Sequence, residues 1–436
     1  MFYIIEKKEQ LDLLGPFDDC FVRLIPKNKY YHPSLTTLSL IYIKPISGEK
    51  GYILCLDHNE AFGLDQHILF NWLDTKTNRL FILDKKEAMY WLPDHSKLFD
   101  LNFIEPVNLS ELKNNNCINY YYRQYPSLHN TGCLIPISKH YEESEEIYNL
   151  SKNSIRLFDP TSIEDWCFWF NNNRAVPMFY QLEKSGLKLD KTRFIEYYGS
   201  TLIHPEFNLN RGKIFTQYNL HTTTTRPSNA FNGINFSAIN KDSGERECYI
   251  PEYDMFVELD IQGYHPRLIA ELIGFEFPEG KNTYEVLGDI LGVTQEKAKE
   301  LTFKQIYGGV WQEYSNKPFF KDIITYVEGV WDEFQYQDKI YFDNKTFRIC
   351  DLKDITPYKL FNYIIQSKET SNNVVLLEKV LDYLKDKKTK IVLYVYDSIL
   401  LDYSREDGNI LQDIVDILKY PLNIKHGLSY NSLEKL

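Results

Sequence analysis

The segment FVELDIQGYHPRLIAEL at residues 256–272 decides the fold, together with IVLYVYDSILLD at residues 391–402. Each begins with an apolar run typical of a buried strand, and the runs lead to Asp260 and Asp397. Strand ends and tight turns hold carboxylates rigidly, so adjacent strands would make these two converge. Carboxylates are preferred ligands of Mg²⁺, and the backbone carbonyl of Ile261 is a further candidate ligand. We therefore expect two Mg²⁺ ions here, with Mn²⁺ as an alternative.

Between the two segments, KAKELTFKQIYGG at residues 297–309 predicts a helix that ends in a glycine pair. Lys299, Phe303 and Tyr307 are spaced by four and lie along one helical face. A cation followed by two aromatic rings suits a nucleoside triphosphate, and Gln295 is a candidate for a further phosphate contact. The alternative is an amphipathic helix whose aromatic residues belong to a core.

Two further segments suit contact with a nucleic acid. TTTTRPSNAFNGIN at residues 222–235 combines hydroxyls and amides with Arg226 and lacks acids, which favours phosphate and sugar contacts. Asn362 and Gln366 share a face of a helix predicted at 358–385, where their amides suit the minor groove. The alternatives are a polar loop and an interhelical hydrogen bond.

Length, composition and net charge limit the functions that these motifs allow. The 436 residues suffice for two or three domains, and 43% are hydrophobic. A formal net charge of −12 opposes nucleic-acid binding unless a basic cleft lies on an acidic body. The seven cysteines form no CxxC pair, and we find neither a membrane-spanning run nor a signal-peptide pattern. We expect a cytoplasmic protein with reduced thiols and no membrane partner.

Periodicity outlines the rest of the chain. Residues 36–58 predict a β-hairpin, whereas 110–160 are polar with weak periodicity and predict a linker or domain edge near 140–160. Helical periodicity begins near residue 161. A strand is expected at 253–261, a helix at about 265–273, and a strand, tight turn and strand at 390–403.

Taken together, these motifs resemble family A DNA polymerases of the bacterial DNA polymerase I type, over roughly residues 165–436. The segment around Asp260 is similar to motif A and includes Arg267, KAKELTFKQIYGG is similar to motif B, and YVYDSI around Asp397 is similar to motif C. The threonine-rich stretch ending at Arg226 and the helix NYIIQ at 362–366 also have counterparts. The order of the motifs is that of the family.

The resemblance implies an α+β fold with a right-hand polymerase palm at 160–272 and 350–436 and fingers at about 273–349. It also implies a DNA primer-template and dNTPs as partners. The metal ligands would then be Asp260 and Asp397, and Lys299 would have a catalytic role at the triphosphate. The implied DNA-binding residues are Arg226, Arg267, Asn362, Gln366 and Tyr396.

Several positions depart from the family. His265 stands where a glutamate usually gates against ribonucleotides, Ser398 replaces the last acid of motif C, and Gln295 replaces an arginine. Only about twenty residues separate Asp190 from Arg211, so a reduced or missing thumb is expected. Low processivity, or a processivity or replisome partner, would follow.

Residues 1–155 resemble the RNase H-like 3′–5′ exonuclease domain of this family. No acid occurs from Phe21 to Ser47, so we expect a degenerate, inactive domain. The remaining acids of this region are expected to be surface residues: Asp18, Asp19, Asp57, Glu87 and Asp100. The compact layout resembles phage-encoded enzymes, which would place the protein in the host cytoplasm.

Three functions remain open. The first is primer-dependent DNA synthesis by a DNA-directed DNA polymerase. The second is a polymerase with relaxed sugar selectivity or RNA-synthesising activity, suggested by His265. The third is a non-catalytic DNA-binding replisome scaffold, suggested by the missing exonuclease acids and the short thumb.

Overall fold

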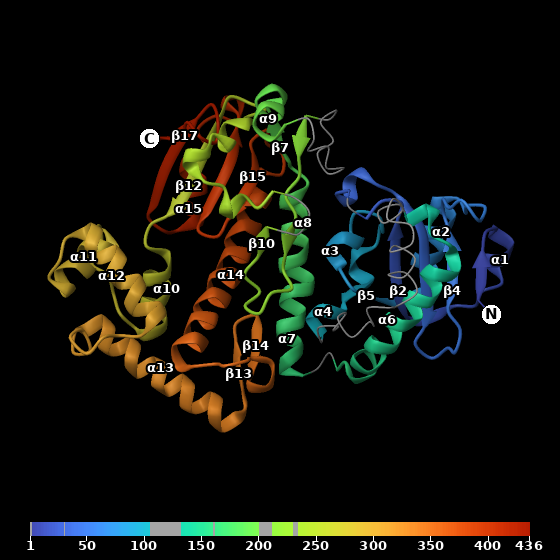
Figure 1. The fold of residues 1–436 in the computed structure, drawn as a ribbon, viewed down its shortest axis with the longest axis horizontal. Helices are drawn as coiled ribbons and strands as arrows, with labels where there is room; N and C mark the ends of the chain where they lie inside the picture. Colours follow the sequence, from blue (N-terminus) through green and yellow to red (C-terminus); the bar gives the residue numbers. More distant parts are fainter. Residues whose placement is uncertain (1, 30, 105–131, 160–161, 200–211, 230–233) are drawn as a thin grey trace. The chain divides into compact units, whose positions relative to one another are not determined.

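The computed structural model describes residues 2–29, 31–104, 132–159, 162–199, 212–229 and 234–436. They form two compact units that divide between Tyr180 and Gln181 (Figure 1). The first unit thus extends past the predicted edge at 140–160, while the assignment of 1–155 and 160–436 to functional domains stays a prediction. In the described part of the chain, every helix is too short or too polar to cross a membrane.

The first unit contains a six-stranded sheet of order β1-β4-β3-β2-β5-β6. Strands β4, β3 and β2 pair antiparallel, and the β1–β4, β2–β5 and β5–β6 pairs are parallel. The β3–β4 pair confirms the hairpin predicted at 36–58. The strand bounds are Tyr3–Ile5 (β1), Phe17–Pro26 (β2), Leu38–Pro45 (β3), Tyr52–Cys55 (β4), Thr77–Ile82 (β5) and Leu98–Asp100 (β6).

Helix α6, Ile137–Leu157, corrects the prediction of a linker near 140–160. Its buried face mixes apolar side chains with small polar ones, including Ser144 and Ser151. Their hydroxyls donate to carbonyls one turn earlier, at 2.6 and 2.8 Å, which satisfies them inside the protein. Such serines weaken the hydrophobic periodicity that marks a helix in sequence. The other helices of this part are α1 (Lys8–Asp12), α2 (Gln66–Lys76), α3 (Lys85–Ala88), α4 (Leu101–Ile104), α7 (Ile163–Phe170) and α8 (Val176–Glu183).

The second unit is built on an antiparallel five-stranded sheet of order β15-β16-β12-β17-β18. Strand β12 lies in its centre, which explains why four successive residues, 256–259, are buried. The predicted strand at 253–261 and the strand, turn and strand at 390–403 are confirmed. The strand bounds are Met255–Ile261 (β12), Lys390–Val395 (β15), Ser398–Tyr403 (β16), Leu422–Gly427 (β17) and Glu434–Lys435 (β18).

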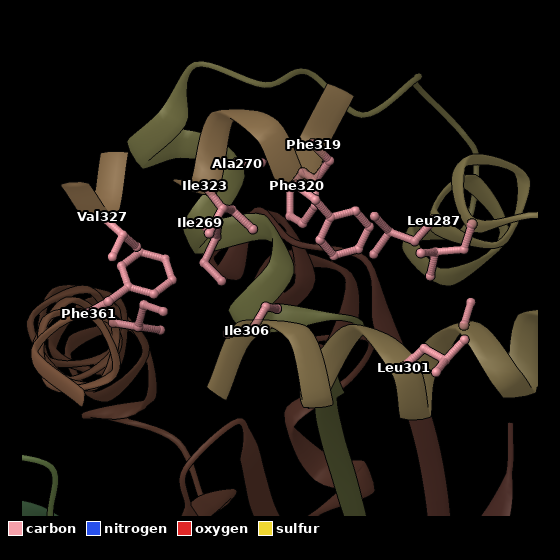
Figure 2. Close-up of a cluster of buried hydrophobic side chains, with 13 residues drawn as sticks. Ile269, Ala270, Leu287, Leu301, Ile306, Phe319, Phe320, Ile323, Val327 and Phe361 are labelled. Atoms are coloured by element: carbon pink, nitrogen blue, oxygen red, sulfur yellow. The ribbon is translucent and has the colours of Figure 1, made fainter. Parts of the chain in front are cut away.

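Five helices pack together beside this sheet, and the long helix α14 connects their cluster with it (Figure 1). Figure 2 shows their shared core, where Ile306 and Leu301 of α12 face Ile323 and Phe320 of α13. The predicted helices at 265–273, 297–309 and 358–385 are confirmed. The bounds are Tyr264–Ile273 (α10), Thr283–Leu291 (α11), Gln295–Gly308 (α12), Pro318–Gln337 (α13) and Pro357–Leu384 (α14).

Short elements complete the second unit. Strands β11, β7 and β8 form one small sheet, and β9–β10 and β13–β14 form two antiparallel pairs. Helix α9 begins the short segment in which the thumb is predicted to be reduced or missing, and residues 200–211 of that segment lie outside the described residues. The bounds are Leu187–Leu189 (β7), Lys191–Tyr198 (α9), Lys213–Ile214 (β8), Tyr218–Asn219 (β9), Ser228–Asn229 (β10), Tyr249–Ile250 (β11), Lys339–Phe342 (β13), Lys345–Arg348 (β14) and Leu411–Leu418 (α15).

Candidate active site

Asp260 and Asp397 meet at one end of the five-stranded sheet. Asp260 is the sixth residue of β12 and pairs with Ser398, the first residue of β16. The N–H of Ile261 donates to the carbonyl oxygen of Asp397 at 2.9 Å, which ties the turn to the neighbouring strand. Strand pairing therefore brings together the two acids on which the sequence argument rests.

The two carboxylates carry uncompensated negative charge. Burial raises the pKa of Asp397 to about 6, and the charges of Asp260 and Glu369 add to that shift. Among the described residues, no lysine or arginine forms an ion pair with either aspartate. A pair of oxygen ligands that repel each other fits a divalent cation, whose charge would offset the repulsion.

Asp260 is also held by a side chain that the sequence motifs did not include. Asn423 of β17 donates from Nδ2 to Asp260 Oδ1 at 2.9 Å. Gln262 in turn donates from Nε2 to Asn423 Oδ1 at 2.9 Å, which fixes the orientation of that amide. The second oxygen of Asp260 is absent from these bonds, so it remains available to a ligand.

Two strained residues border the site. Tyr396 and Thr225 have φ angles of 57° and 56°, in the left-handed region that residues other than glycine seldom adopt. They directly precede Asp397 and Arg226, and the Arg226 guanidinium lies 3.7 Å from the centroid of the Tyr396 ring. Strain of this kind persists only where surrounding contacts hold it, and it concentrates at functional sites.

A stripe of buried or partly buried polar side chains along α14 supplies those contacts, and we call it the α14 stripe: Asn362, Gln366, Glu369 and Asn373. Their spacing places them on one helical face. Asn362 donates to the Tyr307 carbonyl at 3.2 Å, and Gln366 accepts from the Thr224 hydroxyl at 3.1 Å. Asn373 donates to the Tyr396 carbonyl at 2.9 Å. For Asn362 and Gln366, the structure therefore has the protein–protein hydrogen bonds that were the alternative to DNA contact.

Glu369 is the one acid of this stripe, and sequence reasoning missed it. Its side chain is 1% exposed, and Oε2 lies 2.7 Å from Arg226 Nε and 3.3 Å from His265 Nε2. Burial alone would raise the pKa of Glu369, but His265 and Arg226 outweigh it and hold the pKa below its usual value. The other ring nitrogen of His265 is bonded to the Tyr307 hydroxyl.

The face of α12 that carries Lys299, Phe303 and Tyr307 differs from the face that packs into the core. Ala298, Leu301 and Ile306 enter the core, whereas Lys299 and Gln295 are exposed and Phe303 is partly exposed. The rings of Phe303 and Tyr307 are parallel within 5°, with centroids 5.7 Å apart. Tyr307 also packs against the rim of the core, so the core alternative holds for it in part.

Tyr284 of α11 is a second neighbour that the motifs did not reveal. Lys299 Nζ lies 5.8 Å from the centroid of its ring, and the ring of Phe303 lies 6.4 Å from it. Burial raises the pKa of Tyr284, and the charges of Asp397 and Asp260 raise it further. Its hydroxyl therefore lies within electrostatic reach of both aspartates. An isolated tyrosine at the start of a helix carries no sequence signal of this position.

Part of the Arg267 guanidinium is already engaged in contacts within the protein. Its Nε donates to the Gln262 carbonyl at 3.0 Å, and its guanidinium lies 5.8 Å from the centroid of the Phe277 ring. Burial lowers the pKa of Arg267. The remaining guanidinium nitrogens are the part that a DNA contact would have to use.

Two acids of the first unit, Asp19 and Asp100, make contacts within the protein. Arg79 donates from Nε to Asp19 at 2.9 Å. Asp100 was expected at the surface, but it is fully buried and accepts from the backbone N–H groups of Lys85 and Asn102 at 2.8 and 3.0 Å. Its carboxylate orders a strand-to-helix junction, which corrects that expectation.

A solved structure shares this architecture. The chain is similar to the POL domain of Pol1 from M. smegmatis, solved in a complex with DNA primer-template and dNTP, with a TM-score of 0.64 and 14% sequence identity over 97% of each chain. The chain has the fold of a DNA polymerase domain. No protein-family model and no curated protein matches the sequence. At 14% identity the likeness shows the fold alone, and the site is argued from its own residues.

The burial of Asp397, together with the negative charges of Asp260 and Glu369, predicts a stability effect of Asp397→Asn in metal-free buffer. Because the pKa of Asp397 is raised to about 6, its ionisation destabilises the folded state increasingly as pH rises from 4 to 6. At pH 8 the asparagine variant should therefore be more stable by about 3 kcal/mol, and the gain should vanish near pH 4. Chemical unfolding at the two pH values measures it.

Asp386→Asn is the control, since Asp386 is exposed and precedes β15, whereas Asp397 follows the other end of that strand. Equal stability of wild type and Asp397→Asn at pH 8 would show that the folded state does not disfavour the ionised form of Asp397.

Proposed function

We propose that this chain performs template-directed, primer-dependent DNA synthesis from dNTPs. In this reaction the 3′-hydroxyl oxygen of a primer attacks the α-phosphorus of a dNTP, the bond to the bridging oxygen breaks, and pyrophosphate leaves. The observation that carries the proposal is the meeting of Asp260 and Asp397 at one end of the sheet, with the charge of Asp397 acting on Tyr307 of α12. The polymerase-domain fold supports the choice of reaction.

Each site residue has a proposed role. Asp260 and Asp397 hold Mg²⁺, or Mn²⁺, with the carbonyl of Ile261 as a further ligand. Bound divalent ions supply Lewis-acid stabilisation of the charge that develops on the phosphate oxygens. Lys299, Gln295 and the newly recognised Tyr284 face the triphosphate, and Lys299 offsets its charge.

The remaining roles concern the nucleotide and the DNA. Phe303 and Tyr307 pack against the base and sugar, and His265 borders the sugar. The DNA contacts are assigned to groups around the α14 stripe and its neighbours: Arg226, Arg267, Asn362, Gln366 and Tyr396.

The domain assignments belong to the same proposal. The palm would comprise 160–272 and 350–436, the fingers about 273–349, and the thumb would be reduced or missing. Residues 1–155 would form an inactive exonuclease-like domain. Membership of family A, a phage origin, a cytoplasmic location and a processivity partner stay predictions.

His265 favours a second candidate, a polymerase that also accepts ribonucleotides. The imidazole stands at the position where the resembled family has a glutamate, and it is bonded to Tyr307 on the nucleotide helix. Its shape and hydrogen bonding differ from those of a carboxylate. Sugar selectivity is therefore part of the primary test.

The primary test is primer extension on a DNA template with Mg²⁺, in which dNTPs and NTPs are offered separately. We expect extension with dNTPs, and Asp397→Asn should lower its rate by at least about 1,000-fold because a metal ligand is lost. Asp386→Asn serves as the matched control and should extend normally. Extension with NTPs as well would support the second candidate.

A wild-type chain that binds primer-template but extends it with neither nucleotide would refute the proposal. It would favour the non-catalytic scaffold instead.

Lys299→Ala tests the triphosphate contact. Its KM for dNTP should rise about tenfold, equivalent to roughly 1.4 kcal/mol of lost binding, while kcat changes little. Lys304→Ala is the control on the same helix, because Lys304 is an exposed lysine engaged with Glu300. Steady-state kinetics with a single incorporated nucleotide measures both, and equal KM values for the two variants would contradict the assignment.

A further inference from the structure

We propose that Glu369 is a positioning residue that fixes His265 and Arg226 and thereby sets the binding geometry of the nucleotide helix α12. The inference rests on the proposed function for its kinetic consequence. Glu369 lies in the middle of α14 and is almost fully buried, so it cannot contact a substrate without a rearrangement. Its effect must pass through the side chains that it holds.

The carboxylate serves two partners from different segments. Oε2 lies 2.7 Å from Arg226 Nε and 3.3 Å from His265 Nε2, and Oε1 accepts from Arg226 Nη2 at 3.4 Å. Arg226 comes from the threonine-rich segment and His265 from α10. A single buried charge on α14 therefore fixes two chain segments that are about forty residues apart in sequence.

The first arm of this arrangement leads to α12. When the His265 ring is neutral, a proton on Nε2 would face the Glu369 carboxylate at 3.3 Å, and Nδ1 would be left as an acceptor. Nδ1 is bonded to the Tyr307 hydroxyl, which then donates to it. Glu369 thus determines the tautomer of His265 and, through it, the direction of the Tyr307 hydroxyl.

The second arm leads to the aspartate turn. The guanidinium of Arg226 stacks on the ring of Tyr396, the strained residue that precedes Asp397. Asn373, one turn of α14 beyond Glu369, holds the carbonyl of Tyr396. The helix face that carries Glu369 therefore connects the nucleotide helix with the metal-binding turn.

The cost of this arrangement indicates its purpose. Burying an acid opposes folding unless its partners are well placed, and apolar residues of similar size usually stabilise a core as well. Supporting side chains that hold functional groups commonly change affinity or activity by about 10- to 100-fold when they are removed. Glu369 has the burial and the partners of such a support.

The test uses Glu369→Met, which keeps the side-chain size and removes the acceptor. We expect the KM for dNTP to rise at least about tenfold with kcat altered less than about threefold. A merely structural role would instead lower the amount of active enzyme and leave KM unchanged. Asp382→Asn, at an exposed acid of the same helix, is the control.

Two additions keep the test decisive. In a His265→Ala background, Glu369→Met should change KM much less, because the effect passes through His265. Should the single variant fail to fold, Arg226→Met/Glu369→Met removes both buried charges, and its KM should also rise. A folded Glu369→Met protein with wild-type KM, or fully additive effects with His265→Ala, would overturn the inference.

A spectroscopic readout separates this inference from the proposed function. In the wild type, ¹⁵N NMR of labelled histidines should show neutral His265 protonated at Nε2, and Glu369→Met should lose this preference. A wild-type ring protonated at Nδ1 would overturn the positioning role. Absence of primer extension would refute DNA synthesis, whereas the ring measurement would still decide the role of Glu369.

Discussion

The α14 stripe is the constraint on which the candidate site depends. Its four side chains hold helix α12 at Tyr307, the threonine-rich segment at Thr224 and Arg226, and the turn before Asp397 at Tyr396. Buried polar groups are costly when unpaired, so each bond specifies the position of its partner. In this way, one helix positions three segments that are distant from one another in sequence.

Two strained turns are held by buried amides, one from α14 and one from the β13–β14 turn. Thr225 and Tyr396 both adopt left-handed backbone angles, which cost free energy for residues with a side chain. Thr225 accepts from buried Asn344 at 3.0 Å, and Tyr396 accepts from Asn373 of α14. These bonds hold strained turns that present Arg226 and Asp397. The site is thus preorganised by contacts behind it, and its carboxylates remain free of cationic partners among the described residues.

The parts that sequence reasoning predicted are those with a local signal. Strand-like runs before Asp260 and Asp397, and a helix closed by Gly308 and Gly309, are visible in the residue pattern itself. Helix α6 was missed because buried serines weaken its periodicity. Glu369, Asn423 and Tyr284 were missed for another reason: their importance comes from partners about 100 to 165 residues away, or from nearby charges that only the fold brings close.

The central claim is that Asp260 and Asp397 form one divalent-metal site. Anomalous X-ray diffraction from crystals grown with Mn²⁺, primer-template and a chain-terminating nucleotide tests it most directly. The account predicts a manganese peak about 2.1 Å from a carboxylate oxygen of each aspartate, at a distance typical of such ligands. Manganese bound elsewhere, with both carboxylates left without metal in the ternary complex, would contradict it.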